Sequence, residues 1–241
     1  IDTGGILRFG EEEWQKRNNV FEPGEHIVVP FLKSKGIRTI DKLILTHDDQ
    51  DHIGGAVAVL NGIDVKEIVI PEVLKEEFRT TALVNEAVKQ EIKVDMLKTG
   101  DGWKKRGDTF TVLHPDTYKG DSNESSLVLY ARINGMKWLF TGDMGKESET
   151  VLTREWPKLE VDYLKVGHHG SHTSSSADFI DTISPKAAII SAGENNRYGH
   201  PHADVLETFD ERGVSTFRTD KMGAVSYTYL FGRGTFTAEL P

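Results

Sequence analysis

The sequence contains no cysteine, which excludes disulfide bonds, thiolate metal sites and a cysteine nucleophile. No apolar run approaches the roughly 18 residues that a membrane-spanning helix needs, and no signal-peptide pattern opens the chain. Basic residues are outnumbered, with 29 Lys and Arg against 38 Asp and Glu and a net charge of −9. The chain as a whole is therefore not a basic nucleic-acid clamp, although Lys104-Lys105-Arg106 is a local patch that can contact phosphates.

The length and composition predict one domain over residues 1–241. A chain of 241 residues with 37% hydrophobic content can bury one sizeable core. The chain opens abruptly at Ile1-Asp2-Thr3-Gly4-Gly5, a pattern typical of a strand end entering a glycine turn. We expect the first strands of the domain to be missing and the chain to be cut from a larger protein.

The run His47-Asp48-Asp49-Gln50-Asp51-His52 places two imidazoles and three carboxylates within six positions. It follows residues 42–46, typical of a buried strand, and precedes residues 53–60, which can begin a helix. No Lys or Arg lies between Lys42 and Lys66, so the carboxylates would repel one another unless bound cations compensate. A solvated acidic loop with two surface histidines is the alternative, but the flanking strand and glycines favour a fixed loop around metal ions.

The remaining pattern predicts alternating strands and helices, typical of α/β layering. One amphipathic helix is predicted over residues 72–91, with Leu74, Phe78, Leu83, Val84, Ala87 and Val88 on its apolar side. Asn134-Gly135 predicts a hairpin. Strands are predicted over 66–71, 108–113, 126–133, 136–140, 161–166, 187–191, 214–217, 224–230 and 235–240. Further helices are predicted over 147–154, 174–183 and 203–212.

Three more loops follow predicted strands and carry metal-binding atoms: Thr141-Gly142-Asp143, residues 167–172 and residues 199–202. Any one is weak evidence, since an Asp after Gly is most often a turn residue. Together with the acidic run they supply both sides of a two-metal centre. Divalent ions take His nitrogen and carboxylate oxygen, and a carboxylate can bridge two ions roughly 3.5–4 Å apart with a hydroxide between them. Hydrolysis is the chemistry that such a site predicts.

These residues resemble the metallo-β-lactamase superfamily, whose signature is His-x-His-x-Asp-His, a later bridging Asp and a further His. The match runs from residues 2–5 through the acidic run and residues 141–143 to the His168-His169 loop. Two positions depart from the signature. Asp49 stands where the second His is expected, and residues 123–126 stand in place of a mid-chain His, with His114 several residues earlier.

The His-x-Asp-x-Asp-His variant is similar to the C-terminal domain of the ComEC family of bacterial DNA-uptake channel proteins, and so are residues 123–129, 164–171, 198–202 and 218–225. The resemblance implies a four-layer αββα sandwich, a dinuclear metal site and a nuclease that hydrolyses the non-imported single strand of DNA during natural transformation. It also implies a bacterial cell-membrane protein whose channel portion and other DNA-uptake proteins are its partners. This domain is then expected on the extracytoplasmic side, without a nucleotide cofactor.

The resemblance also implies roles for individual residues. The implied metal ligands are His47, Asp49, Asp51, His52, Asp143 as the bridge, and His168. His168 is preferred to His169 because it comes first after the strand and Gly167, where the last ligand of the family stands. An oxygen ligand at Asp49 favours manganese or magnesium over zinc. We therefore expect two divalent ions, manganese or zinc, with magnesium as a further option.

Roles in the reaction follow from the same residues. We expect Asp51, Asp143, His169 and His200 to be catalytic, and Asn123, Ser125, Ser126, Ser171 and His202 to bind the phosphodiester. Each hydroxyl has an equally common structural role as a turn or cap residue. His202 is more typical of a residue beside a helix N-cap, and His114 of a structural residue. For His172 the sequence favours neither a structural nor a catalytic role.

The sequence is also compatible with two other functions. One is a different hydrolase of the superfamily, such as a phosphorylcholine esterase or a lactonase. The other is a DNA-binding module with a vestigial metal site, although almost every expected ligand is present. A basic or polar groove at the metals would favour a DNA enzyme, whereas a closed apolar pocket would favour a lactonase.

Overall fold

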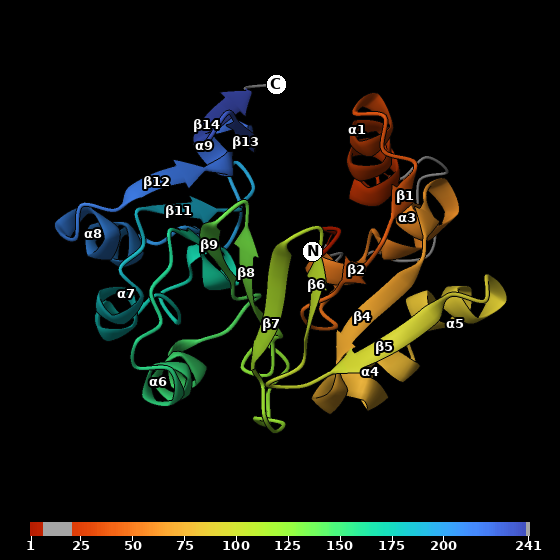
Figure 1. Cartoon of the computed structure of the whole chain (residues 1–241), viewed down its shortest axis with the longest axis horizontal. Helices are drawn as coiled ribbons and strands as arrows, with labels where there is room; N and C mark the ends of the chain where they lie inside the picture. Colours follow the sequence, from red (N-terminus) through yellow and green to blue (C-terminus); the bar gives the residue numbers. More distant parts are fainter. Residues whose placement is uncertain (7–20, 240–241) are drawn as a thin grey trace. The chain divides into compact units, whose positions relative to one another are not determined.

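The computed structural model describes residues 1–6 and 21–239. The chain divides into two compact units, Ile1–Lys98 and Thr99–Pro241 (Figure 1). The single domain predicted over residues 1–241 stays a prediction. Among the described residues, every helix is too short or too polar to cross a bilayer.

The first unit is a small parallel α/β layer. Strands β2 (Leu43–Ile44), β4 (Glu67–Pro71) and β5 (Lys93–Leu97) form a parallel sheet in the order β2-β4-β5. Strands β1 (Thr39–Ile40) and β3 (Asp64–Val65) form a second parallel pair. Parallel neighbours need crossover connections, which here carry α2 (Gln50–Ile53), α3 (Ala56–Gly62), η3 (Glu72–Leu74), α4 (Lys75–Arg79) and α5 (Ala82–Lys89).

The single helix predicted over residues 72–91 is wrong, because the chain breaks at Thr80-Thr81 between α4 and α5. Thr81 has extended backbone angles, and its hydroxyl accepts a hydrogen bond from the Val84 N–H at 3.4 Å, so it caps α5. Val88, predicted on the apolar side, is 71% exposed. Because of this break, the side chains of α5 point in other directions than they would on one continuous helix. The sequence patterns also missed β5 and the segment formed by η2 (Gly24–Val28) and α1 (Val29–Ser34).

The second unit is built on a seven-stranded mixed sheet in the order β12-β11-β10-β9-β8-β7-β6. Strands β9 to β12 run parallel, while β6 to β9 are joined antiparallel. The predicted hairpin at Asn134-Gly135 is confirmed, with φ of 51° and 82° as a two-residue hairpin turn requires. The strands are β6 (Gly102–Lys105), β7 (Asp108–His114), β8 (Val128–Ile133), β9 (Met136–Phe140), β10 (Tyr163–Lys165), β11 (Ala187–Ile190) and β12 (Ser215–Arg218).

Three helices pack on one face of this sheet, as the predicted alternation requires (Figure 1). They are α6 (Lys146–Glu155), α7 (Ala177–Ile183) and α8 (Ala203–Glu211), and a short α9 (Thr219–Met222) follows β12. Their shared core contains Leu139 of β9, Leu164 of β10 and Phe209 of α8, all fully buried. Each unit thus supplies one layer of strands and one of helices, which are the components of the predicted four-layer fold.

Replacing Leu139 by alanine is expected to lower the free energy of unfolding by about 2–5 kcal/mol, because it leaves a cavity at the centre of this core. Leu139 is 0% exposed. Urea unfolding followed by circular dichroism measures the change. The control is Leu230→Ala, since Leu230 is 61% exposed and should change stability by less than about 0.5 kcal/mol. Equal losses in the two variants would contradict this placement of the core.

A hairpin of β13 (Ala224–Leu230) and β14 (Arg233–Glu239) contacts the other face of the sheet through aromatic side chains. Tyr227 and Phe236 meet Trp138 of β9 and Tyr163 of β10, with ring centroids 4.9 Å apart for Trp138–Tyr227 and 5.1 Å apart for Tyr163–Phe236. Gly234 is required here, because a Cβ at that position would lie 1.8 Å from the Tyr227 hydroxyl. Aromatic packing therefore holds a two-stranded ribbon that would be marginal alone.

Candidate metal centre

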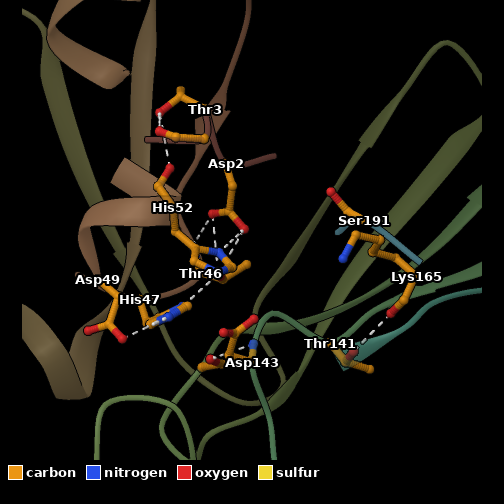
Figure 2. Close-up of polar contacts among 12 residues, drawn as sticks. Asp2, Thr3, Thr46, His47, Asp49, His52, Thr141, Asp143, Lys165 and Ser191 are labelled. Atoms are coloured by element: carbon orange, nitrogen blue, oxygen red, sulfur yellow. Dashed lines mark hydrogen bonds and ion pairs between the residues drawn. The ribbon is translucent and has the colours of Figure 1, made fainter. Parts of the chain in front are cut away.

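In the first unit, the acidic run begins at the end of β2, as the sequence predicted. The His47 side chain is fully buried, with its Nδ1 3.0 Å from the Thr46 hydroxyl and its Nε2 3.7 Å from Oδ2 of Asp49. The ring of His52, on α2, has its centroid 4.1 Å from that of His47. Asp51 lies in the first turn of α2, and Asp49 is its N-cap residue. The turn from strand to helix therefore gathers four predicted ligands in one loop, and Figure 2 shows three of them, His47, Asp49 and His52.

Asp2 orients this loop from the start of the chain, a role that the sequence patterns did not reveal. Its carboxylate lies 3.0 Å from Nδ1 of His52 and accepts a hydrogen bond from the Thr46 N–H at 2.9 Å (Figure 2). Burial raises the pKa of Asp2, but the hydrogen bond and charge of His52 and the Thr46 N–H outweigh burial and hold that pKa below its usual value. A carboxylate on one ring nitrogen directs the other nitrogen of a histidine toward a metal.

Replacing Asp2 by asparagine is expected to weaken metal affinity by about 10–100-fold, because the amide cannot fix the tautomer of His52 as the carboxylate does. Isothermal titration of the metal-stripped protein with Mn²⁺ measures the effect. Asp64→Asn is the control, because Asp64 lies in the same unit and its side chain is 54% exposed. If Asp2→Asn bound Mn²⁺ as tightly as the parent, Asp2 would only hold the first residues of the chain in place and would not orient His52.

In the second unit, three loops meet at one edge of the sheet, as predicted. Residues 141–143, 167–170 and 191–202 follow β9, β10 and β11, which are neighbouring parallel strands. Nε2 of His169 lies 3.5 Å from Oδ2 of Asp143. The His200 ring stacks toward that of His169, with a centroid distance of 6.3 Å. The carboxyl ends of these strands therefore bring together three of the predicted catalytic residues.

The loop after β10 holds two successive histidines in the left-handed region, with φ of 46° at His168 and 55° at His169. Such conformations cost about 1–3 kcal/mol each and cluster at functional sites, where the surroundings enforce them. Here the Ser174 hydroxyl donates to the Gly167 carbonyl at 2.9 Å, and the Ser171 N–H donates to the His168 carbonyl at 2.8 Å. These hydrogen bonds hold the loop in the conformation that sets the positions of its two imidazoles.

The two histidines differ in their surroundings. Nδ1 of His169 lies 2.8 Å from the Ser191 carbonyl, which leaves Nε2 on the side of Asp143. Nδ1 of His168 lies 3.3 Å from the Thr173 hydroxyl. A backbone carbonyl on Nδ1 is the usual support for a metal-binding Nε2. Within this unit, the geometry favours His169 as the ligand beside Asp143, while the assignment to His168 stays a prediction.

The predicted substrate-binding serines are structural partners in this unit. The hydroxyl of Ser126 accepts a hydrogen bond from the Asp143 N–H at 3.0 Å, and that of Ser125 accepts one from the Lys119 N–H at 3.0 Å. Both serines are fully buried. The hydroxyl of Ser171 accepts from the Thr173 hydroxyl at 3.0 Å. Their contact with a substrate stays a prediction, and Ser126 has the clear local effect of fixing the backbone of Asp143.

Asn123 and His114 belong to the neighbouring loop. The amide oxygen of Asn123 is buried and accepts no hydrogen bond from the described residues. Nε2 of His114 lies 2.8 Å from the Glu124 carbonyl, and burial lowers the pKa of this imidazole. The hydroxyl of Ser148 donates to that same carbonyl at 2.8 Å. These contacts agree with the structural role expected for His114.

His200 and His202 lie on a loop that Asn196 fastens. The Asn196 carboxamide accepts from the His200 N–H at 2.9 Å and donates to the His200 carbonyl at 2.6 Å. Burial, followed by the charges of His202, His168 and His169, lowers the pKa of His200 to about 4, so its imidazole is neutral at neutral pH. Nδ1 of His202, at the N-cap of α8, accepts from the His172 N–H at 3.0 Å. His202 thus occupies the N-cap position without a side-chain cap bond to α8, and its ring holds the backbone of His172 instead.

The donor atoms fit divalent ions in each unit taken alone. Two ligands about 2.0–2.2 Å from one tetrahedral ion lie about 3.5 Å from each other. The 3.7 Å between Nε2 of His47 and Oδ2 of Asp49, and the 3.5 Å between Nε2 of His169 and Oδ2 of Asp143, are close to that value. Nitrogen paired with carboxylate oxygen is a donor set that manganese and zinc both accept.

Comparison with known proteins gives the family. Residues 1–194 match the model of the metallo-beta-lactamase superfamily. ComE operon protein 3 of Bacillus subtilis is 42% identical over all of this chain, and Competence protein ComA of Neisseria gonorrhoeae is 34% identical over 88% of it. The chain spans only 31% and 28% of their lengths.

A solved structure shares the fold. CmlA, a diiron beta-hydroxylase from Streptomyces venezuelae, matches 74% of this chain and 44% of its own with a TM-score of 0.54 and 14% identity. At that identity the likeness concerns the fold alone. The family model, in contrast, covers the acidic run, Asp143 and the histidine loop together. By fold and by these residues, the chain belongs to the metallo-β-lactamase superfamily.

Proposed function

We propose that the protein is a metal-dependent nuclease that hydrolyses phosphodiester bonds of DNA, with single-stranded DNA as its substrate. The superfamily binds divalent metals and supports a metal-dependent hydrolase. The observation that carries the proposal is the retention in both units of nitrogen and carboxylate donors at ligand spacing. The relative named Competence protein ComA favours DNA over a small ester.

The proposed centre holds two divalent ions. One set of ligands is His47, Asp49, Asp51 and His52 from the acidic run. The other is Asp143, as the bridging carboxylate, with one histidine of the loop after β10. These assignments rest on the family signature and on the geometry within each unit. When bound, such ions supply Lewis acidity and lower the pKa of bound water toward ~7.

The chain's own residues would then position the substrate and move protons. His200 is neutral at neutral pH and stacks beside His169, so it can donate a ring N–H to a phosphate oxygen without adding charge. Asn123 would contact the phosphodiester through its amide group, whose oxygen accepts no hydrogen bond from the described residues. Ser126 holds the backbone of Asp143, and Asp2 holds His52, so both keep ligands in one orientation.

Asp49 bears on the choice of metal. A carboxylate is a harder ligand than imidazole and suits manganese or magnesium better than a site rich in histidine does. The side chain of Asp49 is 47% exposed, so it can adjust to an ion of larger coordination number. We expect manganese to support the highest activity. Full activity restored by zinc alone would contradict this preference.

Cleavage of end-labelled single-stranded DNA tests the function. The metal-stripped protein is assayed with Mn²⁺, Mg²⁺ or Zn²⁺ restored, beside a phosphorylcholine ester and a lactone. Metal-dependent cleavage of DNA, with no turnover of the small esters, supports the nuclease. Turnover of an ester without DNA cleavage would identify another hydrolase of the superfamily, and DNA binding without turnover at any metal concentration would identify a binding module.

The biological setting is part of the same proposal. We place the chain in a bacterial DNA-uptake protein, as a domain on the extracytoplasmic side of the cell membrane that degrades the strand not imported. Its partners would be DNA, the membrane channel portion of the same polypeptide and other uptake proteins. The support is the name of Competence protein ComA, a relative of which this chain spans 28%. Protease accessibility of the domain in intact spheroplasts tests the side of the membrane.

A further inference from the structure

One end of the seven-stranded sheet carries a row of cations. In the cross-strand register, Lys104 of β6 faces Thr109 of β7, Thr109 faces Arg132 of β8, and Arg132 faces Lys137 of β9. Side chains of directly paired residues point to the same face of a sheet. Lys104, Thr109, Arg132 and Lys137 therefore form one row across four strands, which we call the basic row.

The basic row lies on the face of the sheet that packs against the helices. Alternation along β8 and β9 puts Tyr130 and Leu139 on the same face as Arg132 and Lys137, and both pack in the core with α6, α7 and α8. Lys104 and Arg132 are nevertheless exposed. Solvent thus reaches these two cations, while Thr109 and Lys137 are half-buried.

The charges of the row are poorly compensated within the protein. Among the described residues, none forms an ion pair with Lys104, Arg132 or the adjacent turn residue Arg106. Lys137 contacts Glu160 at 3.4 Å. Arg132 and Lys137 are directly opposite each other, and like charges in such positions destabilise a sheet. In a chain with a net charge of −9, an uncompensated cationic row indicates an anionic partner.

The neighbouring side chains suit a phosphate backbone. Thr109 and Thr111 are half-buried on the same face of β7, and their hydroxyls make no hydrogen bond to the described residues. Hydroxyls alternating with Lys and Arg are common phosphate contacts. A lipid surface fits less well, because a peripheral membrane site needs apolar side chains to insert. The exposed large apolar residues of this unit, Tyr118, Trp156, Tyr198, Leu230 and Phe231, all lie outside β6 to β9.

We propose that the basic row binds the phosphate backbone of single-stranded DNA as a site separate from the metal ligands. The row lies at the beginning of β9, whereas Asp143 follows its end, so about 10 Å or more of strand separates them. A DNA chain of several nucleotides could span that interval, and a single phosphodiester could not. The proposal rests on the proposed function for its choice of DNA, and it predicts that long substrates gain affinity that short ones lack.

Binding without metal tests the row apart from catalysis. Fluorescence anisotropy with a labelled 30-nucleotide single strand is measured in EDTA at about 0.1 M salt. The variant Lys104→Gln/Arg132→Gln should bind about 10–30-fold more weakly and lower the slope of log affinity against log salt by about 1.4, which corresponds to two lost phosphate contacts. The matched control is Lys75→Gln/Arg38→Gln, which removes the same residue types from exposed positions of the first unit and should stay within about twofold of the parent.

Three outcomes of the anisotropy experiment would overturn the proposal. They are the absence of DNA binding by the parent, equal weakening in both double variants, and an unchanged affinity in Lys104→Gln/Arg132→Gln. A separate experiment measures binding to vesicles of phosphatidylglycerol and phosphatidylcholine. If Lys104→Gln/Arg132→Gln loses vesicle binding but keeps DNA binding, the row is a lipid site and the proposal is overturned. A parent that binds DNA through the row but cleaves nothing with any metal would refute only the proposed function.

Kinetics give a second measurement on the intact protein. With saturating Mn²⁺, Lys104→Gln/Arg132→Gln should raise KM for the 30-nucleotide strand by about the same 10–30-fold while leaving kcat within about twofold. Hydrolysis of bis(p-nitrophenyl) phosphate, which is too small to reach the row, should not change. A fall in kcat on that small substrate would instead show damage to the metal centre and would overturn a separate role for the row.

Discussion

Asp143→Asn is expected to reduce metal-dependent DNA cleavage by on the order of 10³-fold. Losing a contact that only supports a ligand costs about 10–100-fold, and Asp143 is proposed as the bridging ligand itself, so its loss should cost more. An asparagine has nearly the same shape but lacks the negative charge that holds two ions together. Cleavage of end-labelled DNA in Mn²⁺ and the metal content by plasma mass spectrometry measure the two consequences.

The variant should fold normally, which separates chemistry from stability. Ser126 contacts the backbone N–H of Asp143 rather than its carboxylate, so that bond survives the substitution. The thermal midpoint of the metal-stripped variant should therefore stay near that of the metal-stripped parent. Asp210→Asn serves as the control, because Asp210 is exposed on α8. If Asp143→Asn kept two bound ions and full activity, the bridging role would be refuted.

In the second unit, the hairpin and the meeting of three loops at one edge of the sheet could be predicted, because short stretches of sequence specify them. Asn134-Gly135 specifies a tight turn by its backbone preferences, and that turn sets the register of β8 against β9. Strands β9, β10 and β11 are short and are each followed by a loop that carries Gly and polar residues. Since β9, β10 and β11 are parallel neighbours, the loops that follow them had to meet at one edge. Asp143, His169 and His200 could thus be grouped from sequence.

Other features depend on contacts that no local pattern encodes. Asp2 and His52 are 50 residues apart, and only the fold brings the carboxylate to the imidazole. The helix break at Thr81 was missed because apolar periodicity continues through it, while a single side-chain cap decides the backbone. The basic row needed the register of four strands. In sequence its members are separated by up to 33 positions.

The choice between His168 and His169 was also beyond the sequence, since position after a strand does not say where a ring points. Both residues have positive φ, so the rule that successive side chains of a strand point to opposite faces does not apply to them. The contact of His169 with the Ser191 carbonyl and its approach to Asp143 come from β11 and β9, the strands on either side of β10. Tertiary geometry, not spacing, thus separates the two candidates.

Single alanine variants of these histidines should therefore differ sharply. His169→Ala is expected to lose about 10²–10³-fold in activity and to bind one ion less tightly, because it removes the imidazole beside Asp143. His168→Ala should lose less than about tenfold, since the His168 ring contacts the Thr173 hydroxyl and the rings of His169 and His200 but makes no ion pair with Asp143 among the described residues. The measurements are kcat on end-labelled DNA and the affinity for Mn²⁺ by titration calorimetry.

The thermal midpoints of the metal-stripped variants provide the control for this comparison, because either alanine still adopts a left-handed conformation that costs about 1–3 kcal/mol. Similar midpoints would assign a difference in activity to the imidazoles rather than to collapse of the loop. The reverse order, with His168→Ala inactive and unable to hold its second ion, would instead make His168 the ligand and His169 its neighbour. That result would also mean that the loop turns when metal binds, since Nε2 of His169 is the nitrogen that lies 3.5 Å from Asp143 here.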